Sequence, residues 1–93
     1  MIGTESRPQR RDRVLNQTAA GTLVLLDLDG GQYYSLDEVS ARVWELCDGE
    51  HAVGAIVETI SAEYDAPPDT IYEDVVAFLE EMRDEKLLVV EGA

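Results

Sequence analysis

The tripeptide Asp29-Gly30-Gly31 constrains this chain more than any other local feature, because it lies between two β-favouring runs. The first run is Thr22–Leu28, which is rich in Leu and Val, and the second is Gln32–Ser35. Glycine tolerates the positive φ that tight hairpin turns need. The pattern therefore predicts an antiparallel hairpin, preceded by a strand over 13–17 and a turn over 19–21.

A helix is predicted directly after this hairpin. Ser35 is placed to accept a hydrogen bond from the Glu38 amide, and the Glu38 side chain can reach back, which makes a reciprocal capping box. Tyr34 and Val39 have the spacing of a hydrophobic staple. An apolar stripe follows, so we expect a helix over about 36–47 that stops at Gly49.

Two further helices complete the expected fold. Apolar residues at helical spacing predict a helix over about 52–64 that ends before Pro67 and Pro68. Another starts near Pro68 or Thr70, with a capping box between Thr70 and Glu73, and continues to about residue 86. The closing run over 87–90 adds a small strand or packs over the core. The expected fold class is α+β, a three-stranded antiparallel β-meander followed by three helices.

The length of 93 residues supports one small domain, and its charge is unevenly spread. The net charge is −13, from 20 acidic and 7 basic residues. Residues 1–13 hold four arginines against two acidic residues, and the remainder holds 3 basic and 18 acidic residues. Residues 1–12 are polar and lack periodicity, so we expect a disordered basic arm before a domain over 13–93. Because the acidic body repels phosphates, no nucleic acid partner is expected.

The single cysteine, Cys47, and the single histidine, His51, exclude an internal disulfide and a four-ligand zinc site. No apolar run opens the chain as a signal peptide would, and none approaches the roughly 20 residues that span a bilayer. We expect a cytoplasmic protein with no membrane partner, metal or cofactor. Cys47 falls on an apolar stripe and Glu80-Glu81 on a solvated helix face, which favours packing and solvation over catalysis, so no enzyme activity is expected.

The third expected strand is an edge of the meander, and it lies next to an unusual helix. The helix expected over 68–86 has an apolar arc of about 160°, whereas contact with one core needs little more than about 100°. Either three layers bury the whole arc or part of it is spare. An unpaired edge beside a spare apolar face captures an extended peptide as an added strand.

An ordered series of features runs through most of the chain. It comprises the run Leu26–Leu36, then Val39, Ala41, Val43-Trp44, Glu45-Leu46 and Gly49, and later Ile56-Val57, Tyr64, Pro68, Glu73-Asp74-Val75, Phe78-Leu79 and Leu87-Leu88. Over about residues 13–90 this series resembles the PqqD-like family, whose members recognise the leader segments of ribosomally made, post-translationally modified peptides. The resemblance implies a winged helix-turn-helix-like fold without DNA-binding function.

The resemblance also implies where a leader peptide would bind: as a strand beside the third strand, packed against the third helix. Alternation along the strand sends one of Tyr33 and Tyr34 to the core side, and which one is left open. Carried over by position, the peptide-binding residues are Gln32, Tyr33, Tyr34, Ser35, Tyr72, Val75, Val76, Leu79 and Arg83.

Within the family, the segment Tyr33–Leu36 and the freestanding length are most similar to the leader-binding proteins of lasso peptide pathways. Those proteins work with a leader peptidase and an ATP-dependent cyclase. The alternative branch presents its precursor to a radical enzyme in pyrroloquinoline quinone biosynthesis. Two other classes fit less well. A winged-helix DNA binder needs more basic residues than this chain has after Arg13. A small carrier protein needs an Asp where the chain has Tyr34.

Overall fold

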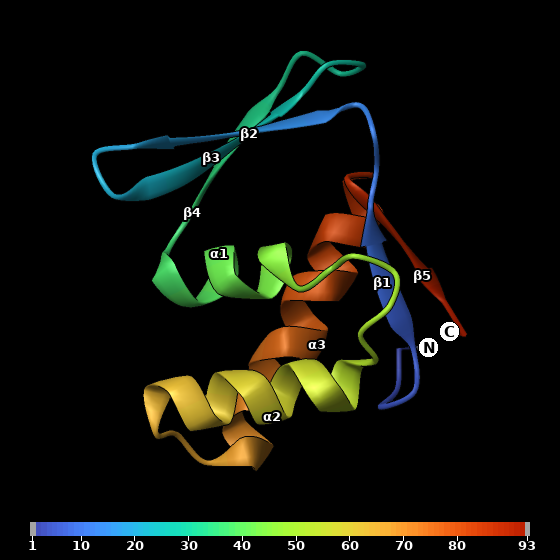
Figure 1. The fold of residues 1–93 in the computed structure, drawn as a ribbon. Coiled ribbons are helices and arrows are strands. Elements are labelled where there is room, and N and C mark those ends of the chain that lie inside the picture. The colour runs from blue at the N-terminus through green and yellow to red at the C-terminus, as the bar shows by residue number, and fades with distance from the viewer. Residues whose placement is uncertain (1, 93) are drawn as a thin grey trace.

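The computed structural model describes residues 2–92, in which a sheet layer lies over a layer of three helices (Figure 1). Met1, the first residue of the expected arm, and Ala93 lie outside the described residues. The elements in chain order are β1 (Arg7–Arg10), β2 (Val14–Ala19), β3 (Thr22–Asp27), β4 (Tyr33–Leu36), α1 (Glu38–Glu45), α2 (Val53–Tyr64), α3 (Pro68–Asp84) and β5 (Leu88–Glu91).

The predicted three-stranded meander is confirmed. Its strands follow the order β2-β3-β4, all antiparallel. The two-residue turn between β2 and β3 has φ of 53° at Ala20 and 80° at Gly21, as a primed hairpin turn requires. The second turn contains Asp29-Gly30-Gly31, and Gly31 has φ of 71°. The fold class is α+β, as the sequence predicted.

The core forms where the inner face of this sheet meets the helices. Leu25 of β3, Trp44 of α1 and Leu79 of α3 are each at most 1% exposed. The Trp44 indole N–H donates to the Asn16 side-chain oxygen at 2.7 Å, so the tryptophan is buried without an unsatisfied donor. Burial of each such side chain contributes roughly 1.5–3 kcal/mol. These side chains belong to one apolar core that the sheet shares with the helices.

The caps of α1 and α3 differ from the predicted capping boxes. Ser35 pairs with Val24 inside β4, and the strand continues to Leu36, which is 7% exposed. Burial of Leu36 keeps the chain extended, so α1 starts later, and the Asp37 carboxylate accepts from the Ser40 amide at 2.8 Å. The N-cap position of α3 is Pro67, with no side-chain cap, because Pro68 already presets the helical φ at the first position.

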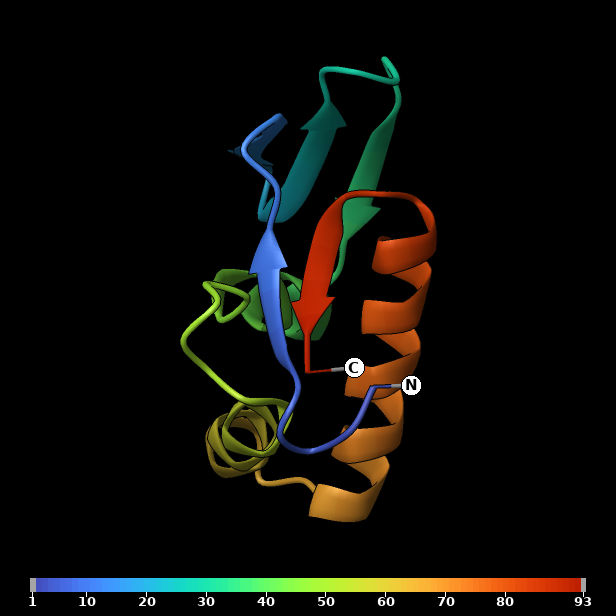
Figure 2. The same cartoon turned by 90° about the vertical axis from the view of Figure 1, so that its right-hand side faces the viewer.

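The expected disordered arm is wrong for the described residues. Arg7–Arg10 form β1, which pairs antiparallel with β5, and Pro8 of β1 lies opposite Val90. Ile2 is 3% exposed, and the Val53 amide at the start of α2 donates to the Ser6 carbonyl at 2.8 Å. Figure 2 shows β1 and β5 side by side. The folded unit therefore begins before residue 13, since its first strand is completed by the last one.

The arginines of this segment serve as helix caps. The guanidinium Nη1 of Arg10 donates to the carbonyls of Trp44 and Glu45, both at 2.8 Å, at the end of α1. Arg11 Nη1 donates to the Lys86 carbonyl at 3.2 Å, just beyond α3. Cations at helix C-termini satisfy orphan carbonyls and favour the helix dipole. The basic charge of the first 13 residues is thus largely structural.

We expect Arg10→Ala to lower the free energy of unfolding by about 1–2 kcal/mol, because two carbonyls at the end of α1 lose their charged donor. Urea unfolding followed by circular dichroism measures the change. The matched control is Arg7→Ala, which removes the same charge from an exposed position on the same strand and should shift stability by less than about 0.5 kcal/mol. Equal losses in the two variants would contradict the capping role.

Candidate functional site

Strand β4 is paired on one side only. Asp27 N–H donates to the Gln32 carbonyl at 2.8 Å, and in this register Leu25 lies opposite Tyr34. Paired and unpaired residues alternate along an antiparallel strand, so the N–H and C=O of Tyr33 and Ser35 point away from β3. Within residues 2–92 no other strand pairs with that side of β4. The structure therefore has an open strand edge with four outward-pointing backbone groups.

The same alternation settles which tyrosine faces the helices. Tyr34 shares the inner face with Leu36 and is half-buried, whereas Tyr33 is 74% exposed on the outer face. The Tyr34 hydroxyl lies 2.8 Å from the Glu85 carboxylate and 2.8 Å from the Gln32 side-chain oxygen. Its single proton goes to the stronger acceptor, the carboxylate. This contact spans the space between β4 and the end of α3.

The contact between Tyr34 and Glu85 also changes the acidity of the tyrosine. The pKa of Tyr34 is raised, first by its hydrogen bond to Glu85 and then by desolvation. Ionisation of Tyr34 would remove the donated proton and place two negative charges together. The hydroxyl therefore stays protonated and keeps its role as a donor.

One flank of α3 faces β4 and α1. Phe78 and Asp74 border a small hollow of about 30 Å³ with Val39 of α1, and Glu85, on the same flank, contacts Tyr34 of β4. With Ile71 at zero and 100° per residue, Phe78, Glu85 and Asp74 lie at about −20°, −40° and −60°. These three residues define what we call the Phe78 flank.

Three residues expected to contact the peptide lie on the other flank. Tyr72, Arg83 and Val76 fall at about 100°, 120° and 140° on the same wheel, so the helix body separates them from the Phe78 flank. All three are partly buried. Contact of Tyr72, Val76 and Arg83 with a peptide at the β4 edge stays a prediction. The apolar arc was read correctly, but the wheel holds no information on which of its two sides the sheet occupies.

Val75 and Leu79 are core residues. They are 1% and 0% exposed, and they lie in the middle of the apolar arc. Burial leaves Val75 and Leu79 almost no exposed surface for direct contact with a peptide. Phe78, which is only partly buried, is a further candidate contact that the sequence prediction did not include. The helical wheel places Phe78 at the edge of the apolar arc, and in the structure the small residue Ser40 of α1 lines the same hollow. The position on the wheel and the small residue on α1 are the sequence features that could have indicated Phe78.

Neither Cys47 nor His51 forms a reactive site. The Cys47 thiol is buried and donates to the Val43 carbonyl at 3.2 Å, and burial raises its pKa to about 12. The His51 ring lies 2.9 Å from the Asp48 carboxylate, and this contact is the main cause that lowers the Asp48 pKa to about 2. Asp48 also accepts from the amides of Glu50 and His51. The pair holds the loop between α1 and α2.

The described part of the chain has neither a cluster of metal ligands nor a membrane-spanning helix. Across residues 2–92 the structure has no group of three or more metal-ligating side chains of the His, Cys, Asp and Glu type close enough to hold an ion. Over the same range, no helix has both the length and the apolar character that a membrane crossing requires.

The fold and the open edge define a class of protein, a small winged helix-turn-helix-like α+β domain with an unpaired strand edge on β4. Residues 22–88 match the family described as coenzyme PQQ synthesis protein D (PqqD). The chain belongs to the PqqD family, which confirms the resemblance seen in the sequence.

Known proteins similar to this chain carry related names. A curated protein of Bradyrhizobium diazoefficiens named PqqA binding protein is 38% identical over 52 residues, which are 56% of this chain and 50% of that protein. The match thus spans about half the length of that relative. The solved structure of TbiB1 in complex with the TbiA(beta) leader peptide is 32% identical, with a TM-score of 0.78, and the match covers 91% of this chain and 96% of TbiB1.

A second solved structure supports the fold. The lasso peptide synthetase B1 complexed with its leader peptide has a TM-score of 0.80, over 89% of this chain and 98% of the other. Its identity is 17%, so the similarity concerns the fold alone.

The open edge predicts an alternating pattern of amide hydrogen exchange along β4. The Tyr34 and Leu36 amides, which point to β3, should exchange at least about a hundredfold more slowly than those of Tyr33 and Ser35. Exchange measured by nuclear magnetic resonance on the full chain tests this. Uniform protection along the strand would mean that the outer edge is already paired in solution.

Proposed function

We propose that the chain is a non-catalytic binding protein that captures the leader segment of a ribosomally made precursor peptide as a strand added to β4. The observation that carries this proposal is the open edge, with the outward N–H and C=O groups of Tyr33 and Ser35. Four such bonds contribute about 1 kcal/mol each, less than the roughly 8 kcal/mol of a micromolar complex. Side-chain contacts must therefore supply the rest.

Those contacts come from the inner face of the added strand. Every second side chain of the peptide points inward, toward the space between β4 and α3. We assign Tyr34 and Gln32 to the strand side of that space, and Phe78, which lies beside Val39 of α1, to its helix side. Val75 and Leu79 support it from below as core residues. In this proposal Tyr72, Val76 and Arg83 make no peptide contact, because they lie on the opposite flank of α3.

We place the chain in a lasso peptide pathway, in the cytoplasm, where it presents the bound leader to a leader peptidase and an ATP-dependent cyclase. The similarity to TbiB1, a protein solved with a leader peptide, extends over 91% of the chain and supports leader recognition, and the segment Tyr33–Leu36 favours the lasso branch. The second candidate is a role in pyrroloquinoline quinone biosynthesis. The family description and the relative named PqqA binding protein favour it.

The test is a calorimetric titration of the full chain with the leader of the precursor encoded beside it, and separately with a PqqA leader. We expect micromolar or tighter binding to the first leader. Ser35→Pro should weaken binding at least tenfold, because proline removes an outward donor of the edge and leaves the bonds to β3 in place.

The control for this titration is Ser35→Ala, which removes the hydroxyl and keeps the backbone N–H. Its affinity should stay within about twofold of wild type. Unchanged affinity in a folded Ser35→Pro chain would contradict strand addition at β4. If the chain bound only the PqqA leader, the result would favour the second candidate, a role in pyrroloquinoline quinone biosynthesis.

A second prediction separates the two flanks of α3. Phe78→Asp should weaken leader binding at least tenfold, because it places a carboxylate where inward apolar side chains of the peptide would pack. Val76→Asp is the matched control, since Val76 is also partly buried on the same helix but lies on the opposite flank. Equal stability of the two variants is checked by thermal unfolding. If only Val76→Asp lost binding, the peptide would instead contact the flank with Tyr72, Val76 and Arg83, as the family resemblance implies.

A further inference from the structure

The outer face of the three-stranded sheet carries no charged side chain. In an antiparallel sheet with one solvated face, that face is ordinarily polar. Here 29% of the residues are charged and the net charge is −13, yet all eight outward positions are neutral. These positions, read from the strand register, are Leu15, Gln17, Ala19, Thr22, Val24, Leu26, Tyr33 and Ser35.

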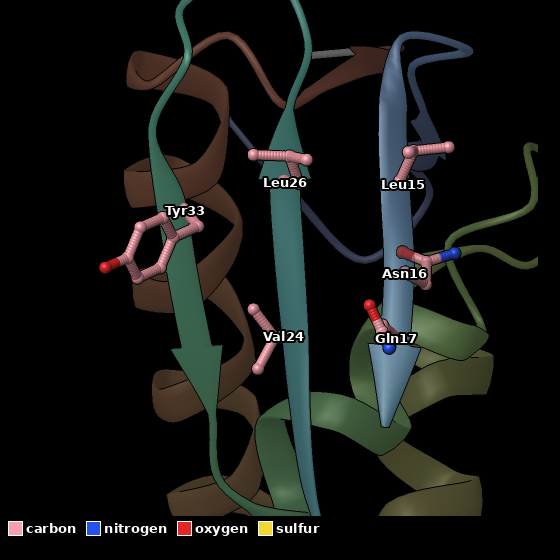
Figure 3. A pocket seen from close by; sticks show the side chains of 6 residues that line it. All are labelled: Leu15, Asn16, Gln17, Val24, Leu26 and Tyr33. Atoms are coloured by element: carbon pink, nitrogen blue, oxygen red, sulfur yellow. The ribbon is translucent and has the colours of Figure 1, made fainter. Parts of the chain in front are cut away.

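An apolar row crosses the middle of this face. Leu15 lies opposite Leu26, which lies opposite Tyr33, so each strand contributes one residue to the row. Their exposed fractions are 52%, 37% and 74%. With Val24 and Gln17 they line a shallow hollow of about 390 Å³ (Figure 3). The three helices lie on the other side of the sheet, so no element among residues 2–92 covers this face (Figure 1).

The charge of the molecule restricts what can cover the face. A second copy would bring another net charge of −13 toward the first, and an anionic membrane surface would be repelled in the same way. A protein with a neutral, apolar contact surface meets neither obstacle, because no charge has to be desolvated at the face itself. The occupant that fits is a partner protein that contributes apolar side chains to this sheet.

The face is continuous with the edge where the leader is proposed to bind. The Tyr33 backbone belongs to the open edge, and its side chain belongs to the apolar row. A strand added to β4 would lie about 4.8 Å away and would place alternate side chains on this same outer face, next to Tyr33. A bound peptide therefore extends the neutral face by one strand.

We propose that the outer face around Leu15, Leu26 and Tyr33 is the docking surface for the enzyme that processes the bound peptide, and that the peptide completes this surface. The inference rests on the proposed function. Three partly exposed side chains make only a small contact area, so the enzyme binds the empty protein weakly and the peptide-loaded protein more tightly. The enzyme thereby distinguishes loaded from empty protein without contacting the buried half of the leader.

The test uses Leu15→Lys in the full chain, which places a charge on the neutral face on β2, two strands away from the peptide edge. Leu15→Gln is a milder second variant. The matched control is Val89→Lys, because Val89 is 49% exposed on β5, outside this sheet. Biolayer interferometry measures binding of the purified peptidase encoded beside the gene, with and without saturating leader, and calorimetry measures leader affinity.

Three results are expected from folded proteins. Leader affinity stays within twofold of wild type in every variant. Peptidase binding to wild type is at least tenfold tighter when the leader is present. Leu15→Lys and Leu15→Gln weaken peptidase binding to the loaded protein, at least tenfold for the lysine, whereas Val89→Lys does not.

Other results overturn the inference. Unchanged peptidase binding in Leu15→Lys, with leader binding intact, would contradict the proposed docking surface but not the proposed function. If the wild-type chain bound no leader, that result would contradict both the proposed function and this inference. Self-association of wild type in analytical ultracentrifugation that Leu15→Lys abolishes would show that a second copy covers the face instead.

Discussion

One-sided pairing of β4 is the constraint on which the rest of the structure depends. Backbone N–H and C=O groups need partners, and an edge strand leaves half of them to solvent. β3 satisfies one side of β4, and the groups of Tyr33 and Ser35 stay outward. The strand is only four residues long, which together with a net charge of −13 limits edge-to-edge association between copies. The same edge then becomes a template for an extended ligand.

The strand also organises the two faces beside that edge. Its inward residues, Tyr34 and Leu36, connect the sheet to the helices, through the Glu85 contact and through core burial. Its outward residue Tyr33 joins an apolar row on the opposite face. A peptide added to the edge would present alternate side chains to both faces. In our proposal these two faces serve separate interactions, one with the peptide and one with a partner protein that binds the peptide-loaded chain.

Local sequence signals predicted the elements well where short-range chemistry decides them. The hairpin at Asp29-Gly30-Gly31 and the helix over about 52–64 are confirmed, because turn glycines and helical spacing act within a few residues. The cap at Ser35 was wrong, since burial of Leu36 extended the strand past a good capping signal. The disordered arm was wrong for a similar reason. Its partner, β5, lies some eighty residues further along the chain.

The sequence by itself determined the meander, the three helices, the open third strand and the apolar arc of α3, because hydrophobic periodicity and turn chemistry are local properties. Only the tertiary structure decided which flank of α3 faces β4. It also decided which tyrosine points inward and that the first residues close the fold. Those outcomes depend on how α3 crosses the sheet, on the strand register and on one long-range strand pair. Each of them is set by packing between distant segments, which the residue pattern of a single helix or strand does not contain.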